Sequence, residues 1–408
     1  MKFEDYKIAK VIKTEIHNLG WARPTDIQFK AIQPILNGED VLAIAQTGTG
    51  KTASFVIPIL NSIHNQLEKK SEHYVRALVM VPTRELAEQV QKVFAEVGKG
   101  IDVRSRSLMG GVSQDDQIAD LDNGIDVVIS TPGRMFDLIS QGVLKVDRLQ
   151  TLVLDEADHM LDLGFIKDIQ DLMRHIPEKR QTLFFSATID KNIKKIAYNL
   201  VRNAIRIQIS PKDPVAKNIE HAVTFVEMDD KRFFLENIVK ENEGLKIMVF
   251  VRTKVRAERV VKALERVGIE AITIHGDVEQ KDRFEVLRKF KDNEVSILVA
   301  TDVAARGIDI PGIGAVINYD LPEEPENYVH RVGRTGRGKE KGVAISFCSE
   351  GEKILLSTIE AYNGTEIAIY DLSKQDYSAI LEDSEDGTND WRSLMAEEEK
   401  RTGKSNEW

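Results

Sequence analysis

Short apolar runs alternate with amphipathic stretches along most of the chain. Short uninterrupted apolar runs are typical of strands in a parallel sheet that is covered on both faces. In the first half these runs are residues 41–45, 77–81, 126–130, 151–154 and 181–185. Stretches with helical spacing follow four of them, at residues 83–97, 132–140, 159–176 and 190–200. This alternation predicts an α/β fold with a mostly parallel sheet and helices on both faces.

Two further helices are expected before the first strand. Apolar residues recur at helical spacing over residues 5–19. Thr25 is a suitable N-cap for a second helix that ends near Leu36.

The alternating pattern stops once and then resumes. Pro211 and Pro214 lie among polar residues in a segment without periodicity, which is typical of a linker. Further strands are expected at residues 222–226, 246–251, 271–274, 296–300, 315–319 and 343–347. The last segment is acidic and weakly periodic, so we expect a loosely ordered tail or a short packed extension. The predicted organisation is a domain over 1–208, a linker over 209–219, a domain over 220–372 and an acidic tail over 373–408.

Composition narrows the class of protein. The 408 residues are enough for two or three domains, and 42% hydrophobic with 30% charged residues is ordinary for a globular protein. The net charge of −10 argues against binding nucleic acid by overall attraction, although a local basic groove stays compatible with it. The single cysteine, Cys348, excludes a disulfide framework within the chain and fits a reducing compartment. Residues 1–6 begin no apolar signal core and no run approaches membrane-spanning length, so we expect a cytoplasmic protein.

Residues 45–52, Ala-Gln-Thr-Gly-Thr-Gly-Lys-Thr, match a phosphate-binding loop except that Ala45 replaces the first glycine. Gly48 and Gly50 allow backbone N–H groups to form an anion nest at the start of a helix. Lys51 is then expected to contact the β- and γ-phosphates, and the Thr52 hydroxyl to ligate Mg²⁺. The alternative is an ordinary glycine-rich turn, but a strand, this motif and a helix in that order favour the phosphate site.

Three carboxylates follow the predicted strand 151–154. Asp155 is placed to complete a metal site through bound water, and Glu156 to orient and deprotonate an attacking water. Acidic residues at a strand end are more often a solvated helix N-terminus. The phosphate loop about a hundred residues earlier makes that alternative the weaker one.

These motifs belong to an ordered series that resembles the DEAD-box RNA helicases over about residues 3–350. The series in the first half is Gln28, 45–52, 82–87 (PTRELA), Gly110-Gly111, 131–134 (TPGR), 155–158 (DEAD) and 186–188 (SAT). In the second half it is 299–309 (VATDVAARGID) and 330–337 (HRVGRTGR). Ala45 is the residue that this family carries in place of the first glycine. Asp26 stands where many members have a second proline.

The resemblance implies two tandem RecA-like domains with the nucleotide site in the interdomain cleft. Gln28 would then read the adenine edge, and Phe3 could stack on the base. The implied nucleotide-binding residues are Phe3, Arg23, Gln28, Gln46, Thr47, Gly48, Thr49, Gly50, Lys51, Thr52, Gly307 and Asp309. Asp309 would accept from the ribose hydroxyls.

The resemblance also implies catalytic and RNA-binding roles. Arg334 and Arg337 would act as arginine fingers at the γ-phosphate, and His330 would bridge toward Ser186 and Thr188. The implied RNA contacts are Pro82, Thr83, Arg84, Gly110, Gly111, Thr131, Arg134, Arg252, Gly276, Arg283 and Thr301. Such residues recognise phosphates and 2′-hydroxyls and carry little sequence information.

The function implied is that of an ATP-dependent RNA helicase that uses Mg²⁺ and works by domain closure as a monomer, with protein partners possible for targeting. ATP and RNA would both favour the closed form and so bind cooperatively. One alternative is an ATP-gated RNA clamp with little unwinding activity, because binding and closure need no strand separation. Another alternative is a DNA helicase of a related branch. The Gln28 block and the 301–309 block argue against it.

Overall fold

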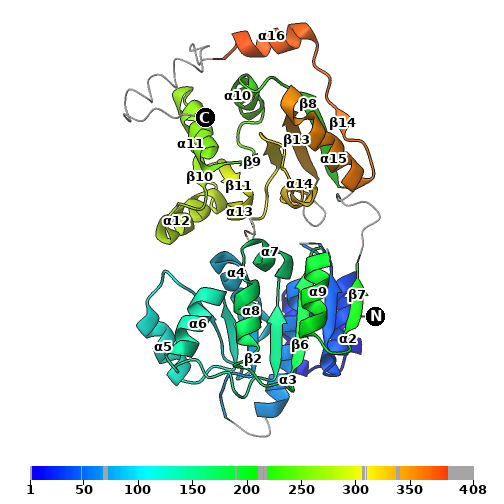
Figure 1. The fold of residues 1–408 in the computed structure, drawn as a ribbon, viewed down its shortest axis with the longest axis vertical. Coiled ribbons are helices and arrows are strands. Elements are labelled where there is room, and N and C mark those ends of the chain that lie inside the picture. The colour runs from blue at the N-terminus through cyan, green and yellow to red at the C-terminus, as the bar shows by residue number, and fades with distance from the viewer. Residues whose placement is uncertain are drawn as a thin grey trace. The chain divides into compact units, whose positions relative to one another are not determined.

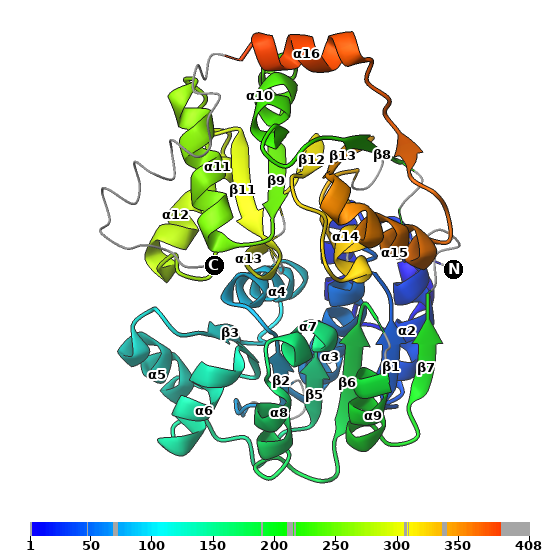
Figure 2. The same ribbon diagram turned by 45° about the horizontal axis from the view of Figure 1, so that its top comes forward.

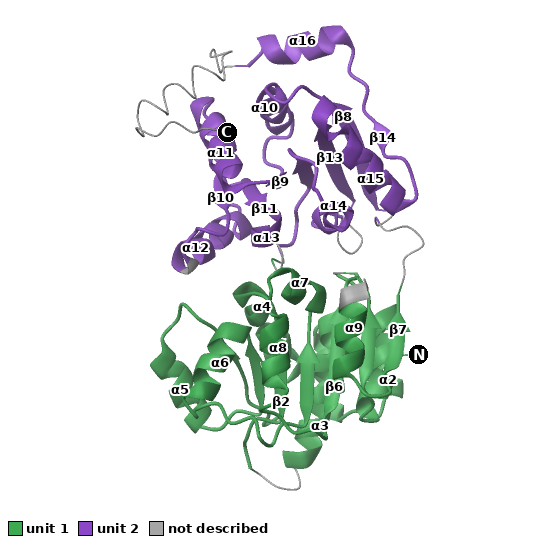
Figure 3. Ribbon diagram, in the orientation of Figure 1, with its two compact units in different colours: residues 1–211, 306–309 green, residues 212–305, 310–408 purple. Residues whose placement is uncertain are grey.

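The computed structural model describes residues 2–46, 48–67, 72–188, 191–209, 215, 218–305, 308, 310–336 and 341–384. The chain divides into two compact units, residues 1–211 with 306–309 (unit 1) and residues 212–305 with 310–408 (unit 2) (Figure 3). Each unit is built on its own seven-stranded sheet, and the strand pairs within both sheets are parallel. Among the described residues, none of the helices combines the length and the apolar character needed to span a bilayer.

The sheet of unit 1 has the strand order β3-β4-β2-β5-β6-β1-β7. Its strands are β1 Val41–Ile44, β2 Ala77–Met80, β3 Ser105–Leu108, β4 Val127–Ser130, β5 Thr151–Leu154, β6 Gln181–Ser186 and β7 Ile205–Gln208. Its helices are η1 Phe3–Asp5, α1 Lys10–Asn18, α2 Asp26–Leu36, α3 Lys51–Leu67, α4 Arg84–Val97, α5 Gln114–Asp122, α6 Pro132–Ser140, α7 Ala157–Asp162, α8 Ile166–Leu172 and α9 Lys191–Leu200.

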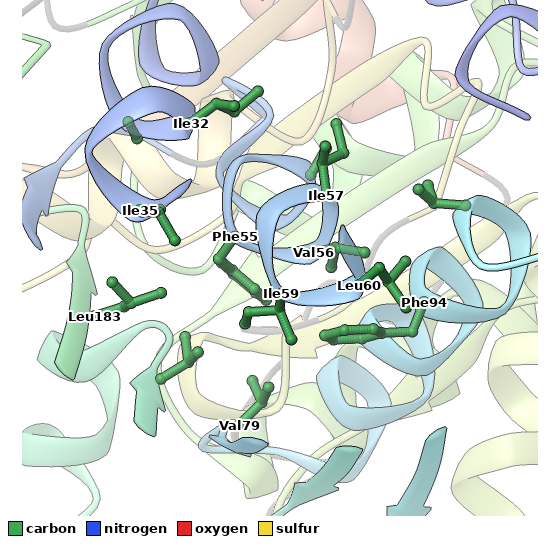
Figure 4. Packing of buried hydrophobic residues seen from close by; sticks show 14 of the residues in the cluster. Ile32, Ile35, Phe55, Val56, Ile57, Ile59, Leu60, Val79, Phe94 and Leu183 are labelled. Carbon is green, nitrogen blue, oxygen red and sulfur yellow. The ribbon is translucent and has the colours of Figure 1, made fainter. Parts of the chain in front are cut away.

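Helices cover both faces of this sheet, because successive strand residues point to opposite sides. Val79 and Val153 join a core with residues of α1–α4, whereas Leu78 and Leu152 join a second core with residues of α6–α9. Figure 1 shows α8 and α9 in front of the strands and the blue helices behind them. In the first core, the Phe55 ring lies 5.2 Å from that of Phe185; Figure 4 shows the packing around Phe55.

Unit 2 repeats this plan with the strand order β10-β11-β9-β12-β13-β8-β14. Its strands are β8 Ile219–Phe225, β9 Ile247–Val251, β10 Ile272–Ile274, β11 Ile297–Thr301, β12 Ala315–Asn318, β13 Gly342–Cys348 and β14 Ala368–Ile369. Its helices are α10 Lys231–Glu241, α11 Lys254–Arg266, α12 Gln280–Lys291, α13 Asp302–Ala305, α14 Pro325–Val332, η2 Glu350–Glu352, α15 Lys353–Asn363 and α16 Lys374–Glu382. Figures 1 and 2 show α14 and α15 together at the β8 side of the sheet.

The predicted fold class is confirmed, with differences at the sheet edges and in one helix. The sequence pattern does not predict strands β3, β7 and β14. These strands lie at sheet edges, most of their residues are partly or fully exposed, and none contains a long continuous apolar run. The single helix expected over 159–176 is two helices, since Gly164 adopts a φ of +83° after α7. Helix α16 forms inside the segment expected to be a loosely ordered tail or a short packed extension, and the Tyr377 ring packs 4.8 Å from that of Phe234.

Candidate active site

The phosphate loop leaves β1 and leads directly into α3, which begins at Lys51. Gly48 and Gly50 have φ angles of +77° and +90°, a left-handed region that side chains rarely allow. The Thr49 hydroxyl donates to the carbonyl oxygen of Gln46 at 2.7 Å and so closes the turn. Thr47 lies outside the described residues.

Gln28 connects the start of α2 to this loop. Its Oε1 accepts from the Thr25 backbone N–H at 3.0 Å, and its Nε2 donates to the Gly50 carbonyl at 3.2 Å. A Cβ on Gly50 would lie 2.5 Å from Gln28 Nε2, so a side chain there would displace the amide. Gln28, which is 6% exposed, is therefore held by both ends of its amide.

Lys51 is 6% exposed, and its ammonium has no hydrogen-bond partner within the described part of the chain. The Ser186 hydroxyl, at the end of β6, is buried and lacks a partner in the same way. A buried ammonium without partners is costly unless a ligand supplies the missing acceptors. Both groups follow strands that are neighbours in the sheet, β1 and β6, so they face one edge. The ammonium and the hydroxyl therefore make this edge of the sheet suitable for binding an anion.

Asp155 lies at the end of β5, is 2% exposed, and accepts a hydrogen bond from the Glu156 backbone N–H at 3.0 Å. Burial raises the pKa of Asp155 to about 7, although Lys51 acts to lower it; the neighbouring Glu156 raises it further. A carboxylate in this position is stabilised by added positive charge. Asp155 and Thr52, a partly buried residue in the first turn of α3, could therefore hold a divalent cation.

Glu156 has φ 51° and ψ 49°, the left-handed conformation, and precedes α7. This conformation is rare outside glycine and asparagine and is often found at functional sites. Further along α7, Asp158 Oδ2 accepts from the backbone N–H groups of Ala187 and Thr188 at 2.9 and 3.0 Å, and from the Thr188 hydroxyl at 3.3 Å. Asp158 thus ties α7 to the segment that follows β6.

The unit 1 residues predicted to bind RNA follow strands β2, β3 and β4. Thr83 caps α4 by accepting from the Leu86 N–H at 3.3 Å. The Arg84 side chain packs against Gly110, where an added Cβ would lie 3.1 Å from Arg84 Nη2. Nε and Nη1 of Arg134 are buried and lack hydrogen-bond partners among the described residues. The remaining members of the set are buried Pro82, exposed Gly111 and partly buried Thr131.

In unit 2, two of the predicted RNA-binding arginines already have partners in the chain. Arg252 Nη2 donates to Glu352 Oε1 at 2.9 Å, and Arg283 Nη2 donates to the Ala304 carbonyl at 2.7 Å. Gly276 is exposed, and Thr301, the last residue of β11, is partly buried.

The predicted arginine finger Arg334 is 6% exposed, and its Nε donates to the His330 carbonyl at 3.2 Å. Gly307, Asp309 and Arg337 lie outside the described residues. At the N-terminus, Phe3 is 4% exposed with its ring 6.4 Å from that of Tyr6, and Arg23 is exposed.

Arg331, which is next to His330, is a buried arginine that the sequence analysis did not single out. It is 1% exposed, and its Nε and Nη2 donate to the two carboxylate oxygens of Asp302 at 2.5 and 2.7 Å. Its Nη1 donates to the Asp320 carbonyl at 2.6 Å. Arg331 therefore holds α14, which carries His330, against α13. Its position within the 330–337 block is the only sequence feature that marks it. The resemblance assigns roles in that block to Arg334 and Arg337 instead.

Comparisons with known proteins match both halves of the chain. The family described as DEAD/DEAH box helicase matches residues 25–196, and the family described as helicase conserved C-terminal domain matches residues 230–339. The chain is 41% identical over 365 residues to the ATP-dependent RNA helicase DbpA of Bacillus subtilis, which covers 90% of this chain and 75% of the relative. It is 40% identical over 372 residues to the ATP-dependent RNA helicase RhlB of Pseudomonas putida, covering 90% and 93%.

Among solved structures, S. cerevisiae Dbp5 bound to RNA and ADP BeF3 has a TM-score of 0.83 at 29% identity. The match covers 93% of this chain and 99% of that one. The similarity therefore includes the folds of both units and the segments that carry the site.

Proposed function

This chain belongs to the DEAD-box helicase family, and we propose on that premise that it is an ATP-dependent RNA helicase. Its reaction is RNA-stimulated hydrolysis of ATP to ADP and phosphate, coupled to local, non-processive unwinding or remodelling of RNA duplexes or ribonucleoprotein. The observation that carries this proposal is the buried ammonium of Lys51, which has no hydrogen-bond partner among the described residues, together with Asp155 and Glu156 at the same edge of the sheet. The names of the relatives support the choice of RNA as the substrate.

ATP is bound by groups that this site leaves available. Backbone N–H groups of the loop and the N-terminus of α3 face the phosphates, and Lys51 supplies the missing counter-charge. Gln28 fixes Gly50, so the amide that would meet the adenine edge is coupled to the phosphate loop.

The residues present also fit Mg²⁺. Asp155 is a buried carboxylate whose charged form is stabilised by added positive charge, and the Thr52 hydroxyl lies in the first turn of α3. Within the described ranges no group of three or more His, Cys, Asp or Glu residues could hold a metal alone. That agrees with Mg²⁺, which is commonly held by one or two carboxylates together with phosphates and water. When bound, the ion neutralises charge on the phosphate oxygens.

Hydrolysis is assigned to Glu156, which accepts the proton of the attacking water. Asp158 accepts three hydrogen bonds from residues 187 and 188, so a displacement of α7 is transmitted to the segment after β6. Arg334 is proposed to stabilise the transition-state charge; removing such an arginine costs roughly 10³–10⁵ in rate in related phosphoryl transfers. RNA is proposed to contact Arg84, Arg134 and their neighbours through phosphates and 2′-hydroxyls.

The proposal further includes a monomer in the cytoplasm, with protein partners possible for its targeting. The single, buried Cys348 supports the reducing compartment. Sedimentation of the purified chain with and without RNA tests the monomer, since a stable dimer at micromolar concentration would contradict it.

The test of function compares ATP hydrolysis with RNA and with DNA of the same sequence, followed by displacement of a short RNA duplex. We expect stimulation by RNA and ATP-dependent strand release. Stimulation without release would favour the clamp, and equal stimulation by DNA would overturn the RNA assignment. As a matched control, Glu156→Gln should keep ATP and RNA binding and lose turnover; a steady-state rate above about a tenth of the parent's would remove Glu156 as the base.

A further inference from the structure

His159, in the first turn of α7, is a buried polar side chain that the mechanism above does not use. It is 4% exposed, and neither ring nitrogen has a hydrogen-bond partner among the residues that the structure describes. Its Nδ1 lies 3.5 Å from Glu156 Oε2. The imidazole therefore stands beside the carboxylate assigned to water activation.

Filling space in the core does not explain an imidazole at this position. The next residue, Met160, is fully buried and packs in the second core of unit 1, as an apolar side chain would. An imidazole with both nitrogens unsatisfied costs free energy that a leucine or methionine would avoid. A polar partner that forms during the reaction would account for that cost.

The local backbone brings the two side chains together. Glu156, the residue before α7, and His159, in the first turn of α7, are three residues apart, and their side chains approach within 3.5 Å. The left-handed conformation of Glu156 fixes the direction in which its side chain leaves the chain. A hydrogen bond from Nδ1–H to Oε2 would fix the orientation of the carboxylate group and therefore the position of Oε1. Catalytic hydrogen bonds are often long before the substrate is bound and shorten in the reactive complex.

We propose that His159 is a positioning residue that donates a hydrogen bond from Nδ1 to Oε2 of Glu156 and so aims the opposite oxygen at the attacking water. This proposal rests on the proposed function, because it assigns a role relative to Glu156 as the base. It requires no change of charge on His159, only an N–H at the δ position.

Three substitutions in the full-length protein separate this role from packing. Asn places an amide nitrogen on Cγ, where histidine has Nδ1, whereas Gln carries its amide one bond further out, and Leu fills the space without a donor. Met160→Leu, on the same helix, is the packing control. The measurements are the RNA-stimulated kcat and KM for ATP, the single-turnover rate of hydrolysis, and the thermal unfolding midpoint of each variant.

We expect His159→Leu to lower kcat about 10- to 100-fold, the effect of misplacing a reacting group, with KM for ATP changed less than about threefold. His159→Asn should recover most of this loss, while His159→Gln should not. Met160→Leu should leave kcat near that of the parent. A His159→Leu protein with kcat within about twofold of the parent, or an Asn variant as impaired as the Leu variant, would overturn the proposal.

A double-variant measurement distinguishes failure of this proposal from failure of the base assignment. If Glu156 is the base and His159 acts through it, adding His159→Leu to Glu156→Gln should change the single-turnover rate less than about twofold. A further large loss in the double variant would show that His159 acts independently of Glu156 and would contradict the positioning role. An active Glu156→Gln protein would instead contradict the proposed base, whatever the effect of His159.

Discussion

Lys51 in unit 1 and Lys231 in unit 2 are both buried lysines, and they differ in what surrounds the ammonium. Lys231 is 0% exposed, and its Nζ donates to the Tyr319 carbonyl at 2.8 Å and to Glu352 Oε2 at 2.5 Å. Lys51 is 6% exposed and has no such partner among the described residues. Both lysine side chains are therefore buried. Among the described residues, only the Lys231 ammonium has hydrogen-bond acceptors.

This difference indicates that the charge of Lys231 stabilises the fold, whereas the charge of Lys51 serves to bind a ligand. Glu352 accepts from Lys231, from Arg252 and from the Leu321 backbone N–H, so a hydrogen-bonded network links α10, the segment after β9 and the segment after β12. A buried ammonium in a full network stabilises one conformation, because removing any member leaves the others unpaired. An unpartnered ammonium contributes nothing comparable to the free protein and gains its acceptors when a phosphate arrives.

Lys231→Met is expected to have the largest effect on folding. It leaves buried Glu352 with Arg252 as its remaining cationic partner and removes the ammonium from Oε2. Removing one partner of a buried ion pair typically costs about 3–5 kcal/mol in the free energy of unfolding, and Arg252 places this loss at or below the lower end of that range. Chemical denaturation, followed by a probe in unit 2, measures this change. A loss below about 1 kcal/mol would mean that the network contributes little and would weaken the comparison.

Glu352→Gln should change how stability depends on pH. Although burial acts in the opposite direction, Lys231 and the Ser349 hydrogen bonds lower the pKa of Glu352 below its ordinary value of 4.5. A carboxyl group with a lowered folded-state pKa stabilises the fold above its unfolded pKa, and this contribution is lost as the pH falls through the folded pKa. The unfolding midpoint of the parent should therefore fall more steeply below about pH 4.5 than that of the variant. Parallel curves would contradict the assignment.

Lys254→Met should have the smallest effect. Lys254 and Asp277 form an ion pair with half of each side chain or more exposed, and such exposed pairs contribute little to stability. The unfolding midpoint of the variant should match that of the parent within error. A clear decrease would show that exposed charges in unit 2 matter as much as the buried network.

The sequence was sufficient for the fold class and for the residues of the phosphate and acidic motifs, because both depend on local patterns. Gly48, Lys51 and Asp155 follow apolar strands at recognisable spacing, and parallel strands bring their carboxyl ends to one edge. Edge strands such as β7 were missed because three of its four residues are exposed. His159 and Arg331 were missed for another reason: their importance depends on what lies beside them in space, which no spacing along the chain encodes.

The most direct test of the difference between the two lysines is Lys51→Met. Thermal unfolding is measured for parent and variant with and without a non-hydrolysable ATP analogue and Mg²⁺. A ligand that binds the folded state raises the midpoint, so the parent should gain several degrees and the variant should lose that gain. Without nucleotide, the variant should unfold close to the temperature of the parent, because the ammonium makes no hydrogen bond among the described residues and because Asp155, whose pKa Lys51 lowers, can take up a proton instead. A variant whose nucleotide-free midpoint falls by several degrees, as expected for Lys231→Met, would show that Lys51 stabilises the fold and would contradict its assignment as a charge that awaits a phosphate.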